Sequence, residues 1–140
     1  MAATHITTHA LRLEVKPGAL ILFPILLALT NFSPLNAWAV VGCLLLHELG
    51  HWLAARAFGV GVEAIGICAW GGFISRERSV SPWHNAAISL AGPAVSLVLF
   101  IAFGFAQQGT FAAINLLLFV GNLLPVPGTD GWRAFKAFTA

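Results

Sequence analysis

The stretch that decides the fold is Leu44-Leu45-Leu46-His47-Glu48-Leu49-Gly50-His51-Trp52, which lies inside a long apolar run. Residues four apart lie on one face of a helix, one turn apart, so a helix here places His47 and His51 together with Glu48 beside them. An acidic side chain at the centre of a membrane helix costs at least about 2.5 kcal/mol. Three ionisable groups within one turn therefore indicate a functional site, because a polar turn that only packs helices needs no particular spacing.

The composition of the whole chain favours a membrane protein. Its 140 residues are 59% hydrophobic and 9% charged, whereas a soluble domain of average usage carries about 25% charged residues. Lipid must therefore cover much of the surface. The length suits one domain, residues 1–140. Seven Lys and Arg residues form no basic patch for nucleic acid, and two cysteines make no disulfide framework.

Four apolar segments predict an all-α integral membrane protein with about four transmembrane helices. They run from about 19 to 32, 35 to 58, 83 to 106, and from 110 to the prolines at 125 and 127. We expect the first to be a retained helix, because residues 1–18 have no apolar signal region near their start. Four crossings place all seven basic residues on one side. The multi-pass chain should therefore have both termini in the cytoplasm and its site near the cytoplasmic side.

Two further segments predict a small membrane-associated sheet. Residues 59–82 contain two apolar runs separated near Gly71-Gly72, which is typical of a β-hairpin or a re-entrant loop. Within the segment 1–18, which we expect to be cytoplasmic, Leu11-Arg12-Leu13-Glu14-Val15-Lys16 alternates apolar and polar residues. This alternation predicts a strand that could join the hairpin.

The pair of histidines fits a zinc site that is completed from elsewhere in the chain. Two imidazoles one helical turn apart can bind one Zn²⁺, and Glu48 can act as general base toward a water molecule at the metal. A catalytic zinc needs a third protein ligand. Asp130, the one aspartate, lies in Asn122-Leu123-Leu124-Pro125-Val126-Pro127-Gly128-Thr129-Asp130-Gly131, and such a broken backbone is tolerated at membrane depth where it lines a cavity. A helix cap is the alternative for Asp130, and the rival third ligands are Glu63, Glu77 and His84.

Taken together, these motifs resemble the site-2 protease family of intramembrane zinc metalloproteases. Besides residues 47–51 and 122–131, Gly71-Gly72-Phe73 is similar to the glycine pair of the family's hairpin, and Leu90-Ala91-Gly92-Pro93 is similar to the motif of its middle core helix. The resemblance covers about Leu11 to Phe135. The chain departs from the pattern at Trp132, where a second glycine is common, and at Ser96, where asparagine is common. Some members carry PDZ or CBS domains, and we expect a minimal form without them.

The resemblance implies a role for each matching residue. His47, His51 and Asp130 would hold one Zn²⁺ per chain, and Glu48 would be the catalytic acid and base. Asn122 would face the site and position substrate or stabilise the oxyanion. The hairpin residues Gly71, Gly72 and Phe73 would present an edge to an unwound substrate strand. The implied activity is hydrolysis of a peptide bond in or near a transmembrane segment of a membrane protein substrate.

A non-catalytic function stays open at the level of the sequence. The chain could be a zinc-binding membrane protein, either a pseudoprotease or an element of a metal transporter. A transporter usually repeats acidic or histidine sites along its path, whereas this sequence has one such cluster. A site that only binds metal also does not need Glu48. The sequence does not specify the oligomeric state.

Overall fold

The computed structural model describes residues 12–68, 71–77, 79 and 81–139. Among these residues, helices dominate and a small sheet accompanies them. The helices are α1 (Ala19–Leu29), α2 (Pro34–Ala57), α3 (Pro82–Phe105), α4 (Gly109–Leu123) and α5 (Asp130–Thr139), and the strands are β1 (Arg12–Val15), β2 (Val62–Cys68) and β3 (Gly71–Arg76). The predicted class, a mostly helical chain with a small sheet, is confirmed.

The two longest helices begin in the same way. Each starts with a Ser-Pro pair, in which the serine side chain caps the helix and the proline occupies its first turn, where a missing N–H costs nothing. The hydroxyl of Ser33 accepts from the N–H of Asn36 at 3.3 Å, and that of Ser81 accepts from the N–H of His84 at 3.4 Å. Both α2 and α3 have 24 residues and are long and apolar enough to cross a membrane.

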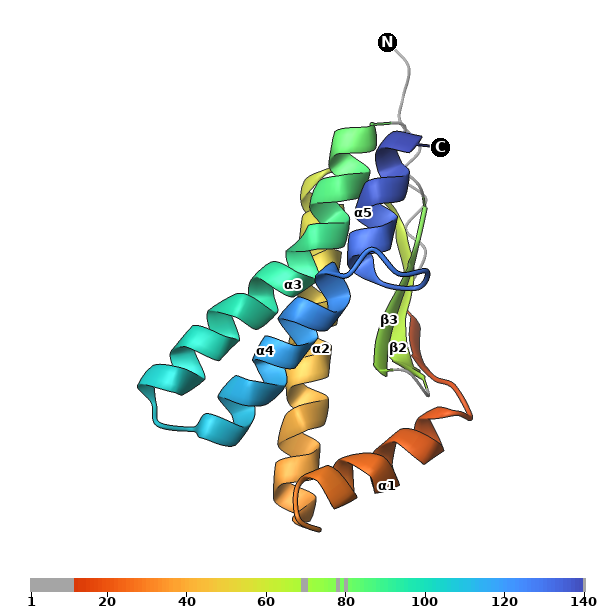
Figure 1. Ribbon diagram of the computed structural model, residues 1–140. Coiled ribbons are helices and arrows are strands. Elements are labelled where there is room, and N and C mark those ends of the chain that lie inside the picture. The colour runs from red at the N-terminus through yellow and green to blue at the C-terminus, as the bar shows by residue number, and fades with distance from the viewer. Residues whose placement is uncertain (1–11, 69–70, 78, 80, 140) are drawn as a thin grey trace.

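The other two apolar helices are shorter. With 11 residues in α1 and 15 in α4, and about 1.5 Å of rise per residue, neither alone spans a hydrocarbon core of about 30 Å. In Figure 1, α1 lies across the lower end of α2 instead of running alongside it. The described part of the chain therefore contains two helices of spanning length, and four crossings stay a prediction.

The last apolar segment is divided into two helices. Residues 124–129 separate α4 from α5. In Figure 1, α4 lies along one half of α3 and α5 along the other, and α3 changes direction about halfway along its length. Pro93, inside α3, lacks the N–H of a normal helical residue, which explains the bend. The bend lies next to Gly92, whose backbone lies close to the rings of His47 and His51.

The sheet has the order β1-β2-β3 and packs beside α2 on the side away from α3 (Figure 1). The antiparallel pair β2–β3 confirms the predicted hairpin, and β1 joins it in parallel, with Leu13 opposite Ile65. Leu11, the first residue of the predicted strand, lies outside the described residues. Ile67 of β2 packs against a buried cluster that includes Leu26 and Val40. This packing holds the hairpin against α2, the helix that carries the His-Glu motif.

Candidate metal centre

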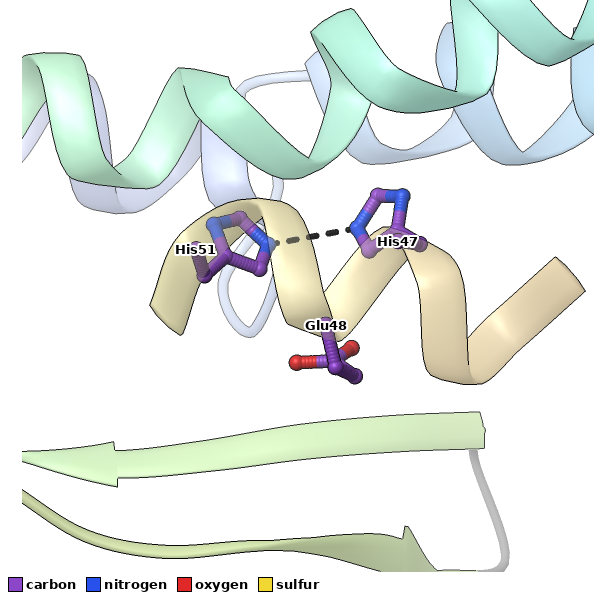
Figure 2. Close-up of side chains that lie close together, drawn as sticks. All are labelled: His47, Glu48 and His51. Carbon is purple, nitrogen blue, oxygen red and sulfur yellow. Dashed lines mark hydrogen bonds between the residues drawn. The ribbon is translucent and has the colours of Figure 1, made fainter. Parts of the chain in front are cut away.

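Helix α2 presents its two histidines to α3. His47 and His51 are both buried, and their Nε2 atoms lie 3.3 Å apart. Figure 2 shows the two rings on the same side of α2, directed toward the neighbouring helix. The four-residue spacing thus places both imidazoles on one face of α2, as the sequence predicts.

The break before α5 brings Asp130 to the same point. Asp130 is the first residue of α5 and is buried, and its Oδ2 lies 3.1 Å from Nε2 of His47 and 3.2 Å from Nε2 of His51. The alternative that Asp130 serves as a helix cap is wrong, because Thr129 takes that position: its hydroxyl accepts from the N–H of Trp132 at 3.2 Å. Gly128 turns the chain before the cap with φ of +103°, a conformation that favours glycine.

The three atoms suit a metal ion better than a set of hydrogen bonds. A tetrahedral zinc with bonds of about 2.0–2.1 Å separates its ligand atoms by about 3.3 Å, and the observed separations are 3.1, 3.2 and 3.3 Å. Nδ1 of His51 lies 2.7 Å from the carbonyl of Ile88. A carbonyl only accepts, so Nδ1 carries the proton and Nε2 of the neutral ring presents a lone pair. Lone pairs that converge on one point in this way need a cation between them. Two imidazole nitrogens and one carboxylate oxygen are ligands that zinc accepts.

A serine on α3 fixes the other histidine. Oγ of Ser96 lies 2.8 Å from Nδ1 of His47, and the Ser96 side chain is fully buried. Partners of this kind orient a metal-binding imidazole and set which nitrogen faces the metal. The sequence marks Ser96 only as a departure from the family's asparagine, and the structure gives it this contact.

The two oxygens of Asp130 have different partners. Arg133, one turn further along α5, places a guanidinium nitrogen 3.7 Å from Oδ1. The other oxygen, Oδ2, is the one that meets the histidines. The nearby guanidinium favours the charged carboxylate, which is the form that a metal ligand needs.

Glu48 occupies a different side of α2. It is buried, and one of its carboxylate oxygens lies within 4.8 Å of a ring nitrogen of each histidine. Figure 2 shows its side chain directed away from the two rings and toward the strands. There it meets β3: a Cβ added to Gly72 would lie 2.4 Å from Cγ of Glu48. No described residue donates a hydrogen bond to this carboxylate, which leaves it available to a water molecule or a substrate.

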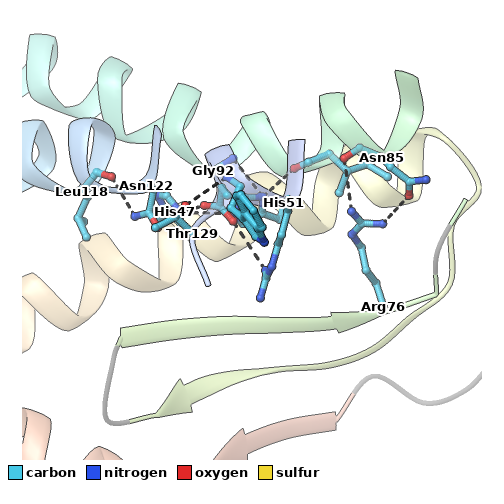
Figure 3. Close-up of polar contacts among 12 residues, drawn as sticks. His47, His51, Arg76, Asn85, Gly92, Leu118, Asn122 and Thr129 are labelled. Atoms are coloured by element: carbon cyan, nitrogen blue, oxygen red, sulfur yellow. Dashed lines mark hydrogen bonds and ion pairs between the residues drawn. The ribbon is translucent and has the colours of Figure 1, made fainter. Parts of the chain in front are cut away.

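The other residues predicted for substrate binding lie on α4 and on β3. The side-chain amide of Asn122 donates to the carbonyl of Leu118 in its own helix at 2.9 Å, so one of its two polar atoms is already engaged (Figure 3). Gly71 and Gly72 begin β3. Phe73 pairs with Gly66 on the face opposite to that of Gly72, and its ring lies under the ammonium group of Lys16.

The rival third ligands lie elsewhere. Glu63 is exposed on β2. The carboxylate of Glu77 lies near Gly61, at the base of the hairpin. The ring of His84 stacks on Phe58 with centroids 4.4 Å apart. Of these four described residues, Asp130 is thus the one that lies beside the histidine pair.

Comparison with known proteins identifies a matching family and similar proteins. Residues 35–111 match the model of Peptidase family M50. A candidate zinc metalloprotease of Synechocystis sp., sll0528, is 37% identical over 116 residues, which cover 74% of this chain and 31% of that protein. Zinc metalloprotease MJ0392 of Methanocaldococcus jannaschii is 32% identical over 117 residues, which cover 71% of this chain and 34% of that protein. The chain thus spans about a third of the length of these relatives.

A solved structure shares the fold. The site-2 protease from Methanocaldococcus jannaschii superposes with a TM-score of 0.79 over 92% of this chain and 67% of that chain, at 23% sequence identity. At this identity the likeness concerns the fold. It extends to the helices and the hairpin that hold the metal centre, and the resemblance drawn from the sequence motifs is confirmed.

Proposed function

The chain belongs to peptidase family M50, and on that premise we propose that it is an intramembrane zinc metalloprotease. It hydrolyses a peptide bond in or near a transmembrane segment of a membrane protein. One observation carries the proposal: Nε2 of His47, Nε2 of His51 and Oδ2 of Asp130 converge within 3.3 Å of one another. The names of the relatives, which describe zinc metalloproteases, support zinc as the metal.

The proposed mechanism needs a Lewis acid, which is the metal, and a general acid and base, which is Glu48. When bound, the zinc ion supplies a Lewis acid that activates a water molecule and polarises the scissile carbonyl. His47, His51 and Asp130 would hold the ion. Glu48, buried beside them, takes the proton from the attacking water and then delivers it to the nitrogen of the leaving amine. A site that only stores or transports metal has no use for this carboxylate, so its position disfavours a non-catalytic function.

Substrate recognition is assigned to the hairpin and to Asn122. β3 pairs with β2 on one side and is the last strand in the order β1-β2-β3, so its other edge can accept a substrate strand through backbone hydrogen bonds. Gly71, Gly72 and Phe73 lie at the start of this edge. The free oxygen of the Asn122 amide would orient the substrate backbone near the metal. A helical substrate segment must unwind first, because its carbonyls are hydrogen-bonded within the helix.

The membrane arrangement follows the same proposal. The chain crosses the bilayer four times, with both termini in the cytoplasm. Because α1 and α4 are too short to span the core alone, each completes its crossing together with the residues that flank it. Large apolar side chains exposed on α3 and α4 support a lipid environment: those of Val98 and Phe105 on α3 and Leu117 on α4 are 65%, 85% and 72% exposed. The positions of Arg56 at the end of α2 and Arg133 in α5 support one basic, cytoplasmic end.

The first experiment measures zinc per chain in detergent-solubilised protein, for the wild type and for Asp130→Ala. We expect about one zinc in the wild type, because the three ligands form one site. The variant should bind zinc at least about a hundredfold more weakly. Mutation of a residue that only hydrogen-bonds to a metal ligand already lowers metal affinity by about 10–100-fold. Glu63→Ala removes an exposed acid on β2 and serves as the control. A folded wild type without zinc would refute the proposal, and zinc retained in Asp130→Ala would show that the third ligand is another group.

A further inference from the structure

The wall of the metal centre opposite α2 is made by one column of residues on α3. Ile88, Gly92 and Ser96 are spaced by four residues, so they lie on one face of that helix. The carbonyl of Ile88 contacts Nδ1 of His51 at 2.7 Å, and the hydroxyl of Ser96 contacts Nδ1 of His47 at 2.8 Å. Gly92 lies between these two contacts, beside the rings (Figure 3).

Gly92 approaches the nitrogens that face the metal. A Cβ at this position would lie 2.2 Å from Nε2 of His51 and 2.6 Å from Nε2 of His47. A zinc ion bound to those nitrogens lies about 2.0–2.1 Å from each. A methyl group on Gly92 would therefore occupy the volume that the ion needs.

Other glycines of the two helices show that this is a separate role from helix packing. Gly50 of α2 packs against α3 itself, since a Cβ there would lie 2.7 Å from Val95 and 2.8 Å from the carbonyl of Ala91. Gly104 of α3 has nothing within 4 Å of an added Cβ. At Gly92 the nearest atoms are those of the two imidazoles and not backbone or apolar side-chain atoms of α2, so an added methyl group would meet the candidate metal ligands first.

We propose that Gly92 is a positioning residue that reserves the volume of the metal, while Ile88 and Ser96, one turn to either side, fix the two rings around that volume. The inference rests on the proposed function of the same site. It has a directional consequence: the backbone of α3 closes one side of the centre. Water and substrate therefore approach from the side opposite α3, where Glu48 and β3 lie.

The test compares Gly92→Ala with the wild type and with Gly104→Ala in detergent. Each protein is stripped with a chelator and titrated with Co²⁺, whose visible absorption reports tetrahedral binding independently of activity. We expect Gly104→Ala to bind like the wild type. Gly92→Ala should bind Co²⁺ at least about a hundredfold more weakly. A methyl group in the place of the metal should cost more affinity than the loss of one hydrogen bond to a metal ligand, which costs about 10–100-fold.

Thermal unfolding of the stripped proteins separates this role from packing. Without metal, Gly92→Ala should keep a cooperative unfolding transition, at a temperature lowered by the displacement of the two imidazoles, and the further stabilisation that added metal gives the wild type should be absent. Three results would overturn the inference. These are wild-type Co²⁺ affinity in Gly92→Ala, the absence of a cooperative unfolding transition in the stripped variant, and a wild type that binds no metal. The last would also overturn the proposed function, whereas the first two leave it standing.

Discussion

The two sides of α2 are built in contrasting ways. On the side of α3, His47 and His51 are each held through Nδ1 by a contact of 2.8 Å or less, and both rings are fixed before a ligand arrives. On the side of the hairpin, Glu48 has no hydrogen bond from a described residue and faces a glycine. The difference matches two chemical tasks. Metal ligands are most effective when they are preorganised, whereas a group that moves a proton must reach water and substrate in turn.

The contrast predicts that substitutions on the two sides of α2 have separable effects. Changes on the α3 side should alter metal binding, as in the Gly92 experiment above. Changes on the hairpin side should alter the reaction and leave the metal in place.

The largest effect is expected for Glu48→Gln. The amide cannot accept the proton of the attacking water, so cleavage of a fluorogenic transmembrane peptide in detergent should fall by about 10²–10⁴-fold. Zinc content should stay at the wild-type level, because Glu48 points away from the metal ligands. Glu63→Ala, at an exposed position on β2, is the control. Loss of zinc in Glu48→Gln would mean that the carboxylate is part of the metal site and that the two sides cannot be separated.

A smaller effect on the same side is expected for Gly72→Ala. The added Cβ would lie 2.4 Å from Cγ and 2.6 Å from Oε1 of Glu48, so the flexible acid must move while the hairpin stays folded. A displacement of about 1 Å can cost about 10²-fold in rate. Cleavage should fall by that order at unchanged zinc content.

Ser75→Ala, at an exposed position in the same strand, should cleave like the wild type. Combining Gly72→Ala with Glu48→Gln should add nothing to Glu48→Gln alone. An additive loss would show that Gly72 acts on the substrate and not through Glu48.

The smallest effect is expected on the α3 side, for Ser96→Ala. This variant removes the contact that fixes Nδ1 of His47 and leaves the three metal ligands intact. Zinc affinity, measured by competition with a chromophoric chelator, should fall by about 10–100-fold. At saturating zinc, cleavage should recover, which distinguishes this variant from Gly72→Ala. Val98→Ala, exposed on the same helix, is the matched control, and an unchanged affinity in Ser96→Ala would show that His47 is oriented by its helix alone.

Much of the fold was predictable because its signals are local. Ser-Pro pairs mark the first residues of α2 and α3, and the alternation around Leu13 marks a strand that does join the hairpin. The division of the last apolar segment into α4 and α5 was only partly visible. The prolines indicate a break, but Thr129 as the cap and Asp130 as the first residue of a new helix depend on how residues 124–129 pack.

By itself, the sequence determined that His47, Glu48 and His51 share one turn of an apolar helix, because a helix fixes the relation between residues four apart. It also favoured Asp130 as the third ligand over its rivals Glu63, Glu77 and His84, because prolines and glycines break the backbone before Asp130. Only the tertiary structure brings Asp130 next to the histidines, since it is 83 residues from His47 in the chain. It also decided the roles of Gly92 and Ser96, whose partners lie on another helix. Contacts between distant segments depend on how whole helices pack, and no local spacing encodes that geometry.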